Sequence, residues 1–153
     1  MERCGFAVLE ASMVNRDTLS LVVRKRPQME TENLLDCYVN LRSEMDTYMK
    51  YLKAWNKKVC MWGASHQGFT LAATTSLGKN VEYIIDSAPF KQGRFAPASH
   101  VPIVPPDHYF EEPVDAVLIV APGYTDEIAG IIKTRFGGKV EIMTLRTNRI
   151  EHL

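Results

Sequence analysis

The chain has 153 residues, of which 46% are hydrophobic and 24% charged. This is the composition of an ordinary folded domain, and it excludes a disordered or fibrous chain. Its 18 Lys and Arg residues balance 18 Asp and Glu residues, so the net positive charge that commonly accompanies binding to nucleic acid or an acidic membrane is missing. No apolar run is long enough to predict a membrane span. The start of the sequence lacks the apolar core of a signal peptide, so we expect a cytoplasmic protein.

The cysteines are three in number, which is odd, and they are widely spaced at Cys4, Cys37 and Cys60. No CxxC pair occurs. This usage is typical of reduced intracellular thiols, and it predicts neither a disulfide framework nor a zinc site.

A hairpin is predicted at the beginning of the chain. Residues 6–10 and 19–24 are rich in apolar and β-branched side chains, and residues 15–17 have turn chemistry between them. A lone two-stranded hairpin is marginally stable in water. We therefore expect this hairpin to belong to a larger sheet, and the chain to be a piece of a larger protein.

The next segment, residues 24–32, is polar and is predicted to be a linker. It begins with the basic cluster Arg24, Lys25 and Arg26. Such a cluster could contact nucleic acid or could be the solvated end of a strand. No second basic cluster accompanies it, which favours the strand end.

A long amphipathic helix is predicted over residues 31–56, with Thr31 as its N-cap. Two interpretations stay open, since the stripe can pack on its own domain or dimerise as a short coiled coil, and packing is the more usual. Its apolar stripe follows spacings of three and four at Leu34, Tyr38, Leu41, Met45, Tyr48, Leu52 and Trp55.

Beyond residue 57 the pattern alternates between strands and helices, which predicts a parallel sheet with helices on its faces. The fold class is therefore α/β, a Rossmann-like parallel sheet preceded by a long helix and an N-terminal hairpin. We divide the chain into residues 1–27, 28–56 and 57–153. Strands are expected at 59–62, 81–86, 101–104, 116–120 and 139–145, and helices at 69–77, stopped by residues 78–80, and at 125–136, capped by Thr125.

The turn after the first of these strands has the spacing of a dinucleotide-binding loop, with Gly63, Ser65 and Gly68 at the three glycine positions. Ser65 argues against a standard NAD site, but a phosphate at the helix N-terminus remains possible. Asp86 ends the next strand, where a ribose-binding acid commonly lies. The alternative is an aspartate that caps the following loop, and both interpretations stay open.

The loop at residues 87–100 carries two cations, Lys91 and Arg94, beside Phe90 and Phe95. It follows the carboxyl end of a strand, where ligands bind in open α/β sheets. The cations could clamp a phosphate, or the segment could be a surface loop folded back over the sheet, and both interpretations stay open.

No catalytic constellation is evident. The histidines, His66, His100, His108 and His152, are scattered, and no nucleophile motif accompanies them. We interpret His66, which lies in a turn, as a hydrogen-bond partner rather than a catalyst.

Three stretches of sequence resemble a known family. They are GASHQGFTL at 63–71, YIID at 83–86 and PFKQGRFAPASHVPI at 89–103. They are similar to the C-terminal domain of sugar C-methyltransferases, S-adenosylmethionine-dependent enzymes that methylate a carbon of a dTDP-linked ketosugar in deoxysugar biosynthesis. The run from Lys91 to Ile103 is the specific part of the likeness.

The resemblance extends upstream. Residues 4–8 and 18–24 look like the last hairpin of a class I methyltransferase domain, and residues 31–56 resemble the helix that joins the two domains. The resemblance implies that S-adenosylmethionine and zinc would bind an N-terminal half that this chain lacks. It also implies that this chain alone is inactive.

The resemblance implies a domain that holds a nucleotide sugar for an N-terminal methyltransferase domain or subunit. From composition and cysteine usage we expect no nucleic acid or membrane partner and no metal in this chain. The turn at 63–68 would present a helix N-terminus, Asp86 would bind a hydroxyl, and Lys91 and Arg94 would face the diphosphate. The alternatives are a stand-alone nucleotide- or coenzyme-A-binding regulatory module, and an interaction domain that dimerises through helix 31–56. The expected substrate-binding residues are Gly63, Ala64, Ser65, His66, Gly68, Asp86, Lys91, Arg94 and His100.

Overall fold

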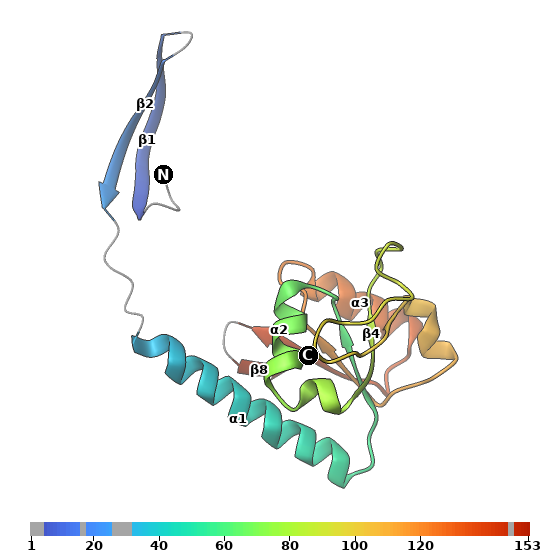
Figure 1. The fold of residues 1–153 in the computed structure, drawn as a ribbon. Helices are drawn as coiled ribbons and strands as arrows, with labels where there is room; N and C mark the ends of the chain where they lie inside the picture. Colours follow the sequence, from blue (N-terminus) through green and yellow to red (C-terminus); the bar gives the residue numbers. More distant parts are fainter. Residues whose placement is uncertain (1–4, 16–17, 26–31, 147–148) are drawn as a thin grey trace. The chain divides into compact units, whose positions relative to one another are not determined.

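A computed structural model of the chain describes residues 5–15, 18–25, 32–146 and 149–153 (Figure 1). Its contacts divide the chain into two units, Met1–Leu35 and Asp36–Leu153, and each is described by itself. The Thr31 cap, Arg26 of the basic cluster and most of the expected linker lie outside the described residues.

The first unit contains the predicted hairpin. Strand β1 (Phe6–Asn15) pairs antiparallel with β2 (Thr18–Lys25), and both strands are longer than the sequence pattern indicated. The described part of the hairpin pairs with no third strand, and several of its large apolar side chains are exposed within this unit. Those more than one-third exposed are Val8, Leu9, Met13, Val14, Leu19 and Val22.

The long helix is confirmed as α1 (Glu32–Ala54). Its apolar stripe is only partly buried. Met45, Met49 and Leu52 pack into the core of the second unit, whereas Leu34 and Trp55 are 58% and 69% exposed. The helix ends before Trp55, and its buried apolar residues lie in its carboxyl half, with Leu41 and Tyr48 partly buried beside the same core. Dimerisation through this helix stays a prediction.

The second unit is built on a six-stranded sheet in the order β5-β4-β3-β6-β7-β8. All neighbouring pairs are parallel except β7 and β8. The chain starts in the middle with β3, moves outward to β5, and returns to β6 beside β3 before moving outward again. The strands are β3 (Val59–Trp62), β4 (Val81–Ile85), β5 (Ile103–Val104), β6 (Ala116–Ile119), β7 (Glu141–Arg146) and β8 (Arg149–His152).

The predicted α/β fold is confirmed, but some boundaries differ. The antiparallel edge strand β8 was not expected. Helix α2 (His66–Thr74) begins three residues before the predicted start and ends before Gly78, because residues 77–79 form a separate 3-10 turn, η2 (Leu77–Lys79). Helix α3 (Thr125–Arg135) has Tyr124, not Thr125, at its N-cap position.

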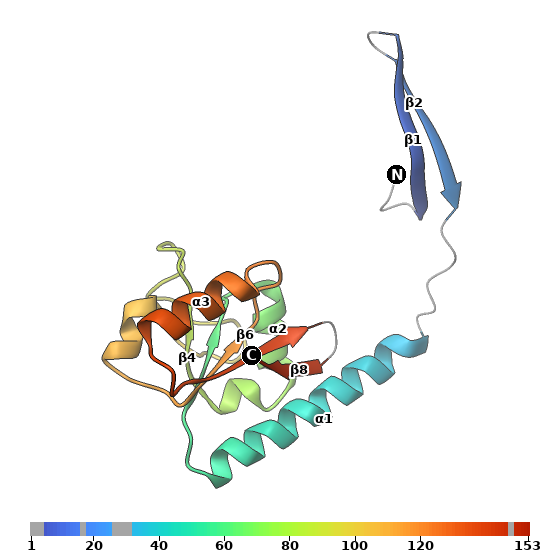
Figure 2. The ribbon, with the colours of Figure 1, turned by 180° about the vertical axis from the view of Figure 1, so that it is seen from behind.

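The sheet has a core on each face. Along β3, Val59 and Met61 point into one core while Cys60 and Trp62 point into the other, as the alternation of a strand requires. Helices α1 and α2 cover the first face and α3 the second (Figures 1 and 2). Burial raises the pKa of the Cys60 thiol, which suits a packing role. This double cover fixes the positions of the strands' carboxyl ends.

The described residues contain neither a membrane-spanning helix nor a cluster of metal ligands. None of their helices is both long and apolar enough to cross a bilayer. No group of three or more His, Cys, Asp or Glu side chains among them is arranged to hold a metal ion.

Candidate functional site

The strand order reverses between β3 and β6, and in open α/β sheets ligands bind outside the carboxyl ends at such a point. Two loops meet there, one after each strand. Gly63 has φ +120°, and a Cβ on it would lie 2.5 Å from the carbonyl oxygen of Val120. Only glycine fits both the backbone conformation and the space. Gly63 therefore allows the two loops to touch.

The turn into α2 is held by a cap. Ser65 is the N-cap residue, and its hydroxyl accepts a hydrogen bond from the Gly68 amide at 3.2 Å. The Ser65 Oγ also lies 3.4 Å from the carbonyl oxygen of Val120. A Cβ on Gly68 would lie 2.5 Å from the carbonyl oxygen of Gly63, so the helix can approach the turn only with glycine there. Ser65 thus occupies the middle glycine position of a dinucleotide-binding loop and caps the helix that follows.

Asp86 lies beside this turn, and both oxygens of its carboxylate accept hydrogen bonds from other groups of the protein. One oxygen accepts from the amide of Ala64 and the other from that of Ala88, each at 2.9 Å. The Lys91 ammonium lies 2.9 Å from Asp86 Oδ2 and 2.9 Å from the carbonyl oxygen of Ala64. We call this arrangement the Asp86–Lys91 clamp. It joins the end of β4 to the turn after β3 and leaves Lys91 one further N–H to donate.

The loop after β4 is folded back on itself rather than extended. Gln92 Nε2 donates to the carbonyl oxygen of Asp86 at 2.9 Å. The amide of Gly93 donates to Ile103, and that of Ile103 donates to Arg94. These bonds lay the loop along β5. They hold Arg94 over the carboxyl edge of the sheet.

A cleft of about 540 Å³ opens between this loop and the start of α2. We call it the loop cleft. Its positive charge comes from Lys91 and Arg94, and none of the described residues that line it is acidic. Phe90 and Phe95 are 72% and 65% exposed at its border. Its lining consists of Ala64, Ser65, His66, Phe69, Phe90, Lys91, Arg94, Phe95, Pro97 and Ile103.

The structure brings together most of the residues expected to bind substrate. Ala64, Ser65, His66, Lys91 and Arg94 line the loop cleft. Other expected residues do not line it and instead shape the turn or the loop beside it. These are Gly63, Gly68, Asp86 and His100, the last an exposed residue with φ +56°.

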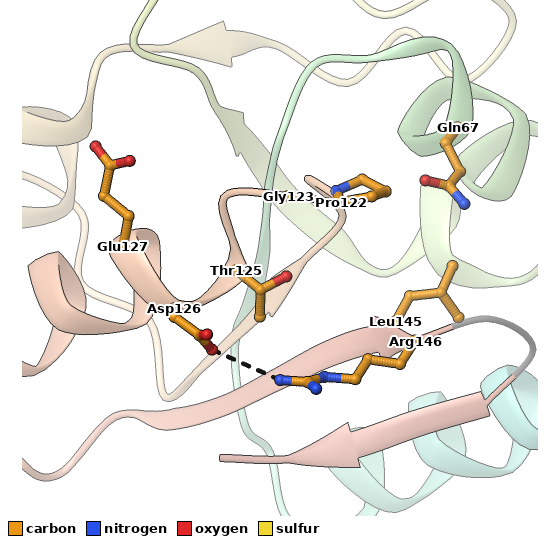
Figure 3. Close-up of a pocket in the computed structure, with 8 residues that line it drawn as sticks. All are labelled: Gln67, Pro122, Gly123, Thr125, Asp126, Glu127, Leu145 and Arg146. Carbon is orange, nitrogen blue, oxygen red and sulfur yellow. Dashed lines mark ion pairs between the residues drawn. The ribbon is translucent and has the colours of Figure 1, made fainter.

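A second cleft, of about 550 Å³, lies at the ends of β6 and β7 (Figure 3). We call it the switch-point cleft. No motif in the sequence predicts this cleft, although a loop with Pro122 and Gly123 after a buried strand is a signal that could indicate one. Arg146 Nη2 lies 3.6 Å from the Asp126 carboxylate across it. Its lining residues are Gln67, Pro122, Gly123, Thr125, Asp126, Glu127, Leu145 and Arg146.

Comparison with known proteins identifies a family. The family model described as the C-methyltransferase C-terminal domain matches residues 32–143, which is more than half of the chain. No curated protein matches the chain. Among solved structures, it is similar to the UDP-D-quinovosamine 4-dehydrogenase of Vibrio fischeri, with 21% identity and a TM-score of 0.49, over 63% of this chain and 93% of the other.

Proposed function

Since the chain belongs to the family of C-methyltransferase C-terminal domains, we propose that its loop cleft holds the nucleotide part of a nucleotide-sugar substrate. The methyl transfer itself is assigned to a methyltransferase domain or subunit to which this chain presents the substrate. S-adenosylmethionine and zinc belong to that partner in this proposal, and no described residue of the chain is given a catalytic role.

The charge of the loop cleft carries the proposal. Arg94 is exposed and makes no ion pair with any described residue, and Lys91 keeps one N–H beyond the Asp86–Lys91 clamp. The amino end of α2 adds free amides and the positive end of its dipole, which favour an anion. A diphosphate carries the negative charge and the several acceptor oxygens that these donors suit.

The exposed aromatic side chains fit the nucleoside part of the same ligand. Phe90 and Phe95 stand at the border of the loop cleft, and the Lys91 ammonium lies 5.7 Å from the centre of the Phe90 ring. A base that stacks on an exposed ring covers apolar surface at little cost in conformational entropy. Neither phenylalanine contributes to the buried core.

A titration of the full chain with dTDP and UDP tests the proposal. Calorimetry measures the affinity, and NMR shifts of the backbone amides locate the site. We expect binding with shifts at residues 64–66 and 90–95. Arg94→Ala should weaken binding by about tenfold or more, because a charge-assisted hydrogen bond is worth about 1.5–3 kcal/mol. Arg149→Ala is the control, since this exposed arginine lines neither cleft, and it should leave the affinity unchanged.

Two results would contradict the proposal. One is that neither nucleotide binds, and the other is that the wild type and Arg94→Ala bind with equal affinity. The same titration should include NAD and coenzyme A. Binding of either in preference to dTDP and UDP would favour the alternative of a regulatory module.

A further inference from the structure

The two clefts lie on either side of the first turn of α2. His66 lines the loop cleft and its neighbour Gln67 lines the switch-point cleft. Both clefts open at the carboxyl edge of the sheet, beyond β4 and beyond β6 and β7. The amino end of α2 therefore borders both clefts.

The charge of the switch-point cleft differs from that of the loop cleft. Asp126 and Glu127 stand in the first turn of α3, and both line the switch-point cleft. Carboxylates in this position compensate the positive end of the helix dipole, and they repel a phosphate. Arg146, the one cation among the described residues that line the cleft, already lies 3.6 Å from Asp126 and 3.5 Å from Glu151. An anionic group therefore suits the loop cleft and not the switch-point cleft.

The lining of the switch-point cleft suits a neutral ligand with several hydroxyl groups. Figure 3 shows Gln67, Thr125 and Arg146 arranged around the open space. The amide and the hydroxyl can each donate and accept, whereas the guanidinium donates only and the carboxylates accept only. A hydroxyl group, which both donates and accepts, can be satisfied at each of these positions.

The cleft also has a fixed shape and an apolar part. The Thr125 hydroxyl lies 3.5 Å from that of Thr144, which is fully buried and lies 3.4 Å from the carbonyl oxygen of Ile119. Leu145 and Pro122 supply apolar surface, on which the C–H groups of a sugar ring can pack. A Cβ on Gly123 would meet nothing within 4 Å, so the space beside this residue is open.

We propose that the switch-point cleft is the subsite for the sugar of the nucleotide sugar. The nucleotide occupies the loop cleft, the diphosphate crosses the amino end of α2, and the sugar hydroxyls bind Gln67, Thr125 and Arg146. This inference rests on the proposed function. It adds a place for the sugar and the residues that hold it.

The test compares ligands with and without the sugar on the full chain. Wild-type protein should bind dTDP-glucose about tenfold more tightly than dTDP, as two neutral hydrogen bonds would give. Gln67→Leu and Thr125→Val should each lower this ratio about threefold to tenfold and leave the affinity for dTDP unchanged. Arg94→Ala should lower the affinities for dTDP and dTDP-glucose by the same factor and leave the ratio between them unchanged. Amides of Gly123 and Arg146 should shift with dTDP-glucose and not with dTDP.

Each result decides between the two proposals. Binding of dTDP with no gain from the sugar, or variants that keep the wild-type ratio, would overturn the sugar subsite and leave the proposed function standing. Failure of both dTDP and dTDP-glucose to bind would overturn both. Thr125→Val keeps the shape of the side chain, so a loss of the ratio with an unchanged melting temperature reports the hydroxyl alone.

Discussion

The Lys91 ammonium lies 2.9 Å from the Asp86 carboxylate. The two residues are five positions apart in the sequence, at the start of the loop that follows β4. Asp86 is 8% exposed, so its charge is shielded from water and needs a partner. The same ammonium also bonds the carbonyl oxygen of Ala64. The shape of the loop cleft therefore depends on an ion pair that the protein makes with itself.

Replacement of Lys91 by methionine should loosen this turn. The carboxylate of Asp86 keeps its two backbone donors but loses its counter-ion, and the Ala64 carbonyl oxygen loses its partner. Because the lysine side chain is 31% exposed, we expect a loss near the lower end of the range for an unmade buried hydrogen bond, about 1–2 kcal/mol in the free energy of unfolding. Urea unfolding measures the loss.

Hydrogen exchange separates the local effect from the global one. In Lys91→Met the amide of Ala64 should exchange faster than in the wild type by more than the change in global stability explains. Lys133→Met on α3 is the matched control, since this lysine is exposed and makes no ion pair with a described residue. A Lys91→Met protein that is as stable as the control, with an equally protected Ala64 amide, would refute the structural role of the clamp.

Gly63→Ala should be among the most damaging substitutions in the second unit. Its φ is +120°, and the new Cβ would lie 2.5 Å from the backbone oxygen of Val120, where no flexible side chain can move aside. Backbone strain of this kind costs about 1–3 kcal/mol, and the clash adds to it. Chemical unfolding of the variant should show a loss of at least that size.

Gly130→Ala is the opposite case. This glycine is inside α3, and a Cβ on it would meet nothing within 4 Å. Alanine should stabilise the helix by about 0.8–1 kcal/mol. If the two alanine variants were equally stable, the contact between the loops after β3 and β6 would not need glycine.

The sequence predicts the centre of this fold better than its edges. The runs at Val59–Trp62 and Ala116–Ile119 are continuous and apolar, as strands buried on both faces must be. Most of the predicted site residues are brought together because they follow the carboxyl ends of β3 and β4, which are neighbours in the sheet. Patterns within short stretches of sequence are therefore enough to predict both the buried strands and the place of the site.

Other features depend on contacts that pattern does not reveal. Strand β8 (Arg149–His152) is short, three of its four residues are polar and none is fully buried, so its pairing with β7 is decided by tertiary contact. The partners of Lys91 could not be predicted, because a cation near a carboxylate can bind either a ligand or the protein. The switch-point cleft joins residues from α2, α3 and β7, which no single motif contains.

Stability should fall in acid through Glu141. Burial alone would raise the pKa of its carboxyl group, but hydrogen bonds from Tyr48 at 2.8 Å and Lys57 at 3.1 Å outweigh it. His152 faces the same carboxylate at 3.3 Å. The pKa of Glu141 thus lies below its ordinary value of 4.5. A lowered carboxyl pKa gives stability that is full above the unfolded-state pKa and is lost as the pH falls through the folded-state value.

Glu141→Gln tests this dependence. At pH 6 the variant should be less stable than the wild type by about 1–2 kcal/mol, because two partly buried hydrogen bonds lose their charged acceptor. At pH 3 the difference should shrink, because below the ordinary carboxyl pKa of 4.5 unfolding takes up a proton at Glu141, which favours the unfolded wild type. Urea unfolding at both pH values measures it. A difference that is the same at both would mean that Glu141 acts through packing and not through its charge.

The two halves of α1 should respond differently to truncation. Leu52 is 1% exposed within the core on the α1 and α2 face of the sheet, so Leu52→Ala should cost about 2–5 kcal/mol through lost burial and a cavity. Val39, on the same helix, is 52% exposed, and Val39→Ala should change stability by no more than about 0.5 kcal/mol. Urea unfolding at several protein concentrations measures both variants. A large loss for Val39→Ala that grows with dilution would show that α1 is covered by a second copy of the chain, because only an association equilibrium makes stability depend on concentration.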